Sequence, residues 1–311
     1  MVKKIFRPVE IVLLGYLAIT LVPALWQTKN HPSGVGTLTA HLLLMVCIAG
    51  IACLFQRLTQ PKNWQIIVRI LYPLALLGFL YGETDFLNNV LVHENLDPLF
   101  AQWESAIFGF QPALEFSKAF PSQLLAETMY FGYFAYYLLV IFVPLYWLKQ
   151  KGLPQTEKLV FIIIQSFLIF YLIFDVLPVA GPQFQYSQLQ HEVPDGYIFG
   201  FLIKRIQQIG EAPTAAFPSS HVALCLILLY QVYRGERKLF YYLMPIGILL
   251  IFSTVYLRAH YVIDCLAAIL IAPVIYKLVH TIQKILFAHF PAIYKLAEPV
   301  QMTSILEIKN Y

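Results

Sequence analysis

Eight long apolar runs dominate the chain, separated by short polar connections and by two longer polar stretches. Each run is close to the roughly 20 residues that a helix needs to cross a bilayer. The pattern therefore predicts an all-α polytopic membrane protein with about eight transmembrane helices. The expected spans are 9–26, 37–55, 64–81, 126–148, 159–177, 218–233, 239–257 and 260–279.

The two polar stretches divide the chain. Residues 82–125 mix acidic and apolar positions and are broken by prolines, which predicts short amphipathic helices outside the membrane or at its surface. Residues 178–216 are rich in Pro and Gly and are expected to form a long outer loop. We expect two N-terminal transmembrane helices in 1–63, a six-helix membrane core in 64–280 with 82–125 and 178–216 as its outer segments, and a cytoplasmic tail in 281–311.

Composition supports the membrane class. Hydrophobic residues make up 59% of the chain and charged residues only 12%, against about 25% charged in soluble domains. No basic tract interleaved with aromatic residues indicates a nucleic-acid partner. All four cysteines lie inside apolar runs and are expected to pack as small hydrophobes, with no disulfide or zinc framework: Cys47, Cys53, Cys225 and Cys265.

Lys and Arg sort unequally between the two sides of the expected bundle. Most lie at the N-terminus, in alternate connections and in the tail, and the positive-inside rule makes these sides cytoplasmic. The first run is too long for a signal peptide and is interpreted as a retained span. Both termini are then inside, and eight spans satisfy that parity. The outer side holds only a few basic residues: Lys29, Lys118, Lys204, Arg205 and Arg258.

Two histidines stand at the ends of apolar runs on the predicted outer side. His221 ends the sequence Phe-Pro-Ser-Ser-His, and His260 follows 39 residues later. That separation fits one crossing, a turn at 234–238 and one crossing back, so the two side chains are expected at facing helix ends. Asp264 follows His260 by four residues and shares its side of the helix, where a carboxylate can hold the imidazole in one tautomer.

These residues resemble motifs of the type-2 phosphatidic-acid phosphatase superfamily. Pro218, Ser219 and His221 match its Pro-Ser-x-His motif; His260 and Asp264 match its His-x-x-x-Asp motif, with Ser253 at the leading serine. The resemblance is strong over 217–268, weaker over 81–116 and 175–184, and closest to the branch that contains inositol phosphorylceramide synthase. It implies a six-helix phosphatase-type core formed by spans three to eight.

The same residues can carry out phosphoryl transfer. His260, oriented by Asp264, can attack phosphorus, while His221 protonates the leaving oxygen and then activates an acceptor. The superfamily assigns these roles to the matching positions. The phosphate is expected to bind to Ser219, Ser220 and the free N–H groups of the helix that they begin. Further candidates are Arg258, Lys204 and Arg205.

The chain also departs from the superfamily pattern. A lysine seven residues before Arg-Pro, its first motif, is absent. Gln183 follows Gly181-Pro182 where a basic residue would suit a phosphate, and Thr254 replaces the arginine of the third motif.

The sequence thus predicts a multi-pass lipid phosphatase or phosphotransferase that acts through a phosphohistidine, without a metal or cofactor. Its partners are a membrane lipid and a polar acceptor, either water or an alcohol such as inositol, and inositol-phosphate transfer to a lipid is one such reaction. The sequence assigns neither the lipid nor the oligomeric state.

Two alternatives remain at this point. The histidines and Asp264 also have metal-ligand spacing, which would define an intramembrane metal-dependent hydrolase; loss of activity in a chelator and rescue by zinc would favour it. A non-enzymatic lipid transporter is the other, although the internal repeats common in transporters are not found.

The charge sorting predicts that Asp195 lies outside and Arg237 inside. Single cysteines placed at the two positions should react differently with a membrane-impermeant thiol reagent added to intact cells. We expect labelling at position 195 only, because the positive-inside rule places 234–238 in the cytoplasm. Labelling at 237 without labelling at 195 would invert the topology.

Overall fold

The computed structural model describes residues 6–30, 33–57 and 62–289, and this part of the chain is helical without strands. The helices are α1 (Pro8–Asn30), α2 (Gly34–Arg57), α3 (Asn63–Leu87), α4 (Asp97–Phe108), α5 (Pro112–Ala119), α6 (Gln123–Lys151), α7 (Leu153–Val176), α8 (Pro182–Gln185), α9 (Ile198–Gly210), α10 (Ser220–Gly235), α11 (Arg237–Tyr256) and α12 (Val262–His289), with a 3₁₀ helix, η1, at Ser187–Glu192.

Seven of the described helices are long and apolar enough to cross a membrane, which confirms a multi-pass membrane protein: α1, α2, α3, α6, α7, α11 and α12. The sixth expected span corresponds to α10, which has only 16 residues. This helix packs against α6, α7, α11 and α12, and most of its apolar side chains are buried.

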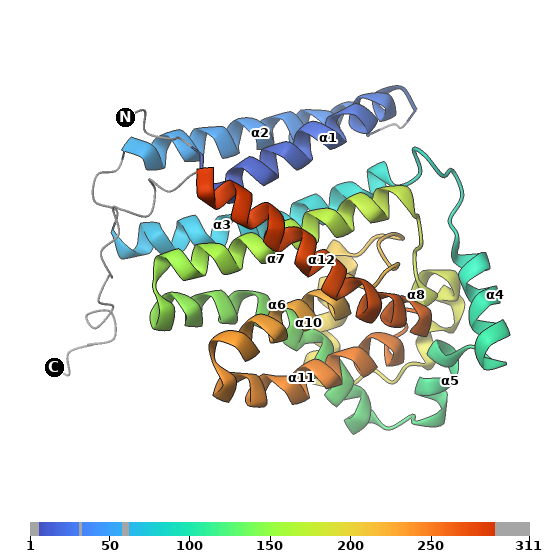
Figure 1. The fold of residues 1–311 in the computed structure, drawn as a ribbon. Coiled ribbons are helices and arrows are strands. Elements are labelled where there is room, and N and C mark those ends of the chain that lie inside the picture. Colours follow the sequence, from blue (N-terminus) through green and yellow to red (C-terminus); the bar gives the residue numbers. More distant parts are fainter. Residues whose placement is uncertain (1–5, 31–32, 58–61, 290–311) are drawn as a thin grey trace.

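The long helices form one bundle with a cap of short helices (Figure 1). The hairpin of α1 and α2 lies along one side of the bundle, with α1 against α3 and α7. Helices α4, α5 and α8 gather at the end where α7 finishes and α12 starts. The expected amphipathic helices of 82–125 are thus α4 and α5, and the expected loop 178–216 contains α8, η1 and α9.

Helix α3 extends six residues beyond its expected end at 81, so Glu83 is a buried helix residue and not part of an outer segment. Its carboxylate contacts His41 Nδ1 of α2 at 3.1 Å, while His41 Nε2 contacts the Leu17 carbonyl of α1 at 2.9 Å. Because a buried carboxylate is tolerated when a polar partner faces it, the helix does not have to end where its sequence becomes acidic.

Helix α12 also runs further than expected and ends at His289. The boundary predicted at 281 therefore falls inside this helix, and Gln283 on its last turns is buried and donates to the Lys158 carbonyl of α7. Residues 290–311 of the expected cytoplasmic tail lie outside the described residues.

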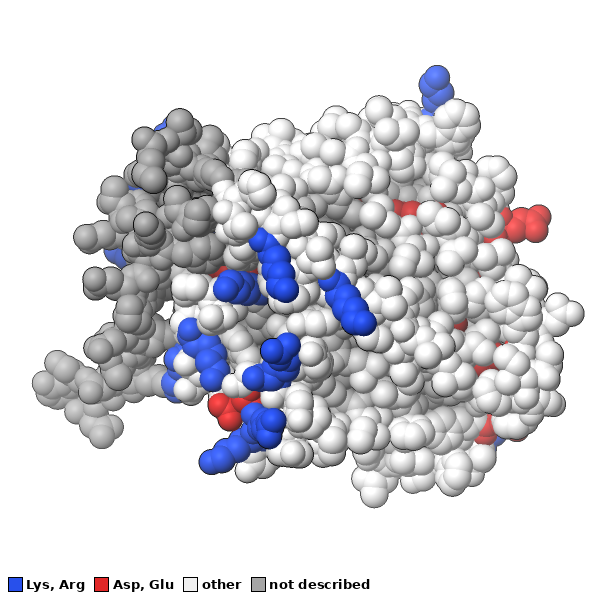
Figure 2. Space-filling view, viewed as in Figure 1, with Lys and Arg blue, Asp and Glu red and all other residues white. Residues whose placement is uncertain are grey.

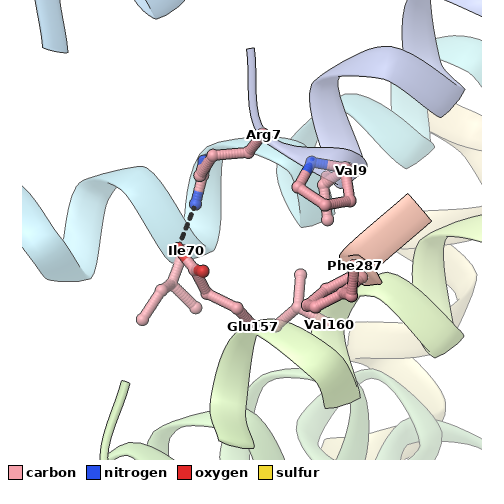
Figure 3. Close-up of a pocket in the computed structure, with 7 residues that line it drawn as sticks. Arg7, Val9, Ile70, Glu157, Val160 and Phe287 are labelled. Atoms are coloured by element: carbon pink, nitrogen blue, oxygen red, sulfur yellow. Dashed lines mark hydrogen bonds and ion pairs between the residues drawn. The ribbon is translucent and has the colours of Figure 1, made fainter. Parts of the chain in front are cut away.

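Arg7, next to α1, fastens the N-terminal hairpin to the rest of the bundle. Its guanidinium donates to Glu10 at 3.1 Å, to Glu157 of α7 at 3.3 Å and to the Arg69 carbonyl of α3 at 2.8 Å. Figure 3 shows Arg7 and Glu157 facing each other beside a small pocket that Val160 and Phe287 also line. The pocket lies at the start of α7, the opposite end of that helix from the cap.

Charge is distributed unevenly along the bundle. Figure 2 shows Lys and Arg gathered toward the end at which α6 finishes and α7 starts, and Asp and Glu mainly toward the capped end. The three-dimensional arrangement therefore reproduces the separation of charge on which the predicted topology rests.

Close packing at Gly132 predicts a stability effect. A Cβ at this position of α6 would overlap Ser253 Oγ and lie 2.7 Å from Leu249 Cγ of α11. Gly132→Ala should lower the free energy of unfolding by about 1–3 kcal/mol, as overpacking does elsewhere. Thermal unfolding in detergent measures this loss of stability. Gly78→Ala is the matched control, because a Cβ added at Gly78 would have nothing within 4 Å. Equal melting temperatures for the two variants would contradict the packing.

Candidate active site

Two chain segments carry the histidines to the capped end of the bundle. Ser219 is the N-cap of α10, and its Oγ accepts a hydrogen bond from Val222 N at 3.3 Å, which places His221 in the first turn. The turn between α11 and α12 carries His260, whose N–H donates to the Thr254 carbonyl at 3.1 Å. The Ser219 N–H donates to the Asp264 carbonyl at 3.2 Å and joins the two segments.

The two imidazoles are in direct contact. His260 Nε2 lies 3.3 Å from His221 Nδ1, with ring centroids 5.4 Å apart. His260 is buried at 3% exposure, whereas His221 is half-buried. The structure therefore brings together the two histidines that the sequence singled out, although they stand 39 residues apart.

The backbone determines the protonation state of His260. Its Nδ1 lies 2.8 Å from the Ala216 carbonyl, an acceptor, so Nδ1 must carry the proton. Burial lowers the pKa of His260 to about 4, which keeps the ring neutral near pH 7. Its Nε2 consequently carries a lone pair and faces His221.

Asp264, which the sequence predicts to orient His260, lies beside the imidazole but is not its nearest acceptor. Its Oδ2 lies 3.5 Å from His260 Nδ1 and accepts a hydrogen bond from Tyr261 N at 2.8 Å. The closer acceptor for Nδ1 is the Ala216 carbonyl. Asp264 thus holds the turn that carries His260 and places a carboxylate beside the ring.

Aromatic side chains of α6 form a wall next to His221. The ring centroids of Tyr133 and Tyr136 lie 4.9 and 4.5 Å from the His221 ring. Both tyrosines are almost fully buried. These contacts hold the ring of His221 against α6.

Glu211 and Gln183 are polar residues of the site that sequence reasoning did not assign. Glu211 Oε1 accepts a hydrogen bond from the Tyr133 hydroxyl at 3.2 Å, and Oε2 accepts one from Gln183 Nε2 at 2.7 Å. Loss of solvent raises the pKa of Glu211, while these donors and the nearby His260 oppose the rise. The one signal in the sequence was Gln183, noted where a basic residue would have suited a phosphate.

Two carboxylates of α4 hold the backbone around the histidines. Asp97 accepts the N–H groups of Ala180 and Gly181, both at 2.7 Å, and the Tyr261 hydroxyl at 3.2 Å. Glu104 accepts the N–H groups of Val262 and Ile263 at the start of α12. Nothing in the sequence marked these two among the acidic residues of 82–125, because their partners lie about 80 and 160 residues away.

The basic candidates for phosphate binding already have other partners. The Arg258 side chain is fully buried, and its guanidinium contacts the Leu189 and Leu114 carbonyls, Ser117 Oγ and Glu192 Oε2. Lys204 pairs with Asp195. Arg205 donates to Gln208 and lies over the Phe201 ring. In this structure Arg258 joins η1 to α5, and the two residues of α9 make local contacts.

The serines remain beside the histidines. Ser219 is fully buried, and because its Oγ accepts from Val222 N, its hydroxyl proton is available to another acceptor. Ser220 is also buried and begins α10, whose first N–H groups have no acceptor within the helix. Among the described residues, no three His, Cys, Asp or Glu side chains form a group that could hold a metal ion.

Comparison with known proteins agrees with this architecture. The profile of the PAP2 superfamily matches residues 100–278, more than half of the chain, and the chain belongs to that superfamily. A curated PA-phosphatase related-family protein of Dictyostelium discoideum is 24% identical over 187 residues, which cover 53% of this chain and 34% of the relative. The chain thus matches about a third of that relative's length. No solved structure matches at a comparable level of significance.

Glu104 predicts a pH dependence of stability. Burial raises the pKa of Glu104 from 4.5 to about 7, so the folded state keeps a proton that the unfolded state loses in this window. Stability from this group is therefore lost as pH rises from about 5 to 7, by at most about 3 kcal/mol. Glu104→Gln should gain stability relative to the wild type between pH 5 and pH 8.

Thermal unfolding of both proteins in detergent at the two pH values measures this difference. Glu94→Gln is the control, because Glu94 is exposed in the loop before α4. If the difference in melting temperature between the wild type and Glu104→Gln were the same at both pH values, Glu104 would not titrate between them.

Proposed function

We propose that this protein is a membrane lipid phosphatase or phosphotransferase that works through a phosphohistidine at His260. Membership in the PAP2 superfamily supports a phosphatase-type activity on lipid phosphates. The observation that carries the proposal is the contact of His260 Nε2 with His221 Nδ1 at 3.3 Å. The other ring nitrogen of His260, Nδ1, donates its proton to the Ala216 carbonyl, which leaves Nε2 as the reacting atom.

In the first half-reaction, the His260 Nε2 lone pair attacks phosphorus and the bond from phosphorus to the leaving oxygen breaks. His221 enters this step as an imidazolium with a proton on each ring nitrogen, gives its Nδ1 proton to that oxygen and becomes neutral. His260 then carries the phosphoryl group on Nε2 and a proton on Nδ1, so its ring is positive. The Asp264 carboxylate, 3.5 Å from Nδ1, stabilises that charge.

In the second half-reaction, His221 takes a proton from the acceptor hydroxyl. The acceptor oxygen attacks phosphorus, the bond from Nε2 to phosphorus breaks, and His260 returns to its neutral state. The buried hydroxyls of Ser219 and Ser220 and the first N–H groups of α10 bind the phosphate oxygens through both steps.

The position of the site supports reaction at the outer face of the membrane. The first turn of α10 and the turn before α12, which carry the two histidines, lie at the capped end of the bundle, away from the end where Lys and Arg gather. With that basic end in the cytoplasm and α10 counted as the sixth of eight crossings, both termini are inside. A lipid would enter sideways between helices, and a polar acceptor would arrive from outside.

The particular reaction follows from the closest sequence resemblance. The inositol phosphorylceramide synthase-like branch moves a phospho-headgroup between a lipid and an alcohol, and we propose that this chain does the same or a related reaction. Arg258, Lys204 and Arg205 contribute as phosphate ligands only if substrate binding releases them from their present partners.

The two histidines should fail in different ways when replaced. His260→Ala removes the nucleophile, so no phosphoenzyme should form. His221→Ala should slow reaction of a lipid phosphate by about 100- to 10,000-fold, the usual contribution of acid–base catalysis. With a p-nitrophenolate leaving group, which needs little protonation, His221→Ala should recover most of the wild-type rate of the first half-reaction. Asp264→Asn should lie between the wild type and His260→Ala, since the nucleophile is retained.

Rapid quenching and detection of acid-labile phosphate on the protein measures each variant. Phosphohistidine in His260→Ala but not in His221→Ala would reverse the two roles. Full activity in both variants would mean that the histidines are structural.

A further inference from the structure

Glu211 is attached to both halves of the histidine site. Its Oε1 accepts from the hydroxyl of Tyr133, whose ring packs against His221. Its Oε2 accepts from the side chain of Gln183, and the Gln183 N–H donates to the Arg258 carbonyl at 2.8 Å, two residues before His260. Two independent anchors therefore hold this carboxylate in the wall of the site.

The hydrogen bonds of Glu211 favour its ionised form. Both oxygens face donors, a phenol hydroxyl and an amide NH₂ group. An ionised carboxylate accepts at both oxygens, whereas a protonated one would need an acceptor for its own proton. Glu211 and His260 also interact electrostatically, which places the negative charge close to the nucleophile.

The cations that could offset this charge are engaged elsewhere. Arg258 pairs with Glu192 at 3.0 Å and with backbone carbonyls, and Lys204 pairs with Asp195. What remains for a phosphate is the N-terminus of α10, equivalent to about half a positive charge, and the neutral hydroxyls of Ser219 and Ser220. This set complements a phosphate with one negative charge better than a phosphate with two.

We infer that Glu211 is a specificity-determining residue that selects a phosphodiester, with one negative charge, over a dianionic phosphomonoester as the phosphoryl donor. The inference rests on the proposed function and narrows its substrate class. A second negative charge about 6 Å from a carboxylate, at an effective dielectric constant of about 20, weakens binding by on the order of 100-fold. Smaller distances or weaker screening change the factor but not its direction.

The test uses two chromogenic substrates with the same leaving group, p-nitrophenyl phosphate and ethyl p-nitrophenyl phosphate. At pH 8 the first is a dianion and the second a monoanion. Full-length protein in detergent micelles is assayed for kcat/KM on each. Glu211→Gln should raise the ratio of monoester to diester kcat/KM by about tenfold to 100-fold, because it removes the repelling charge and keeps the shape. Glu211→Asp, which keeps the charge, should keep the wild-type preference.

Controls separate this effect from general damage. Glu94→Gln removes the same charge from an exposed position and should leave the ratio unchanged. Tyr133→Phe removes one hydrogen bond to Glu211 but keeps the ring against His221, so it should change both substrates alike. A purely structural role of Glu211 would likewise lower both values and leave their ratio constant, which would overturn the inference.

A second measurement covers the case in which Glu211→Gln does not fold. Inhibition of the wild type by ethyl phosphate and diethyl phosphate at pH 8 compares a dianion with a monoanion directly. The inference requires the lower inhibition constant for diethyl phosphate, and tighter binding of ethyl phosphate would contradict it. Failure of the wild type to release p-nitrophenol from either substrate would instead count against the proposed function, so the two failures are distinguishable.

Discussion

The need to satisfy buried polar backbone groups governs this structure. The two histidines are carried by irregular segments at the end of an apolar bundle, and the N–H groups of these segments cannot be left without acceptors. The chain meets this need with carboxylates from α4: Asp97 binds the N–H groups of residues 180 and 181, and Glu104 binds those of residues 262 and 263. Both segments then hold their shape, and with them the Ala216–His260–His221 arrangement.

The same constraint explains the use of charge around the site. Arg258 has a left-handed backbone conformation, φ 63°, and its buried guanidinium joins η1 and α5 through carbonyls and Glu192. A fully buried arginine needs such partners, because an unpaired one would be costly. The cation that the sequence offered for phosphate binding therefore stabilises the cap, while the buried serines Ser219 and Ser220 remain beside the histidines.

A second polar group is placed inside the bundle on the same principle. His41 and Glu83 pair between α2 and α3, and Arg7 pairs with Glu10 and Glu157 at the other end of α1. These contacts fasten the N-terminal hairpin to α3 and α7 at two levels. The hairpin and α3 both lie outside residues 100–278, which match the PAP2 superfamily, and the contact of Arg7 with Glu157 joins this N-terminal part directly to the matched region.

The sequence by itself determined the helical membrane class, seven of the eight expected spans and the pairing of His221 with His260, because hydrophobic length, charge bias and residue spacing are local properties of the chain. Only the tertiary structure decided that the Ala216 carbonyl holds His260 Nδ1, that Arg258 binds the cap, and that Glu211 and Glu104 belong to the site. Each of these contacts joins residues at least 44 positions apart in the chain. Tertiary packing and the need of buried polar atoms for hydrogen bonds select such contacts, and these two factors leave no periodic pattern in the sequence.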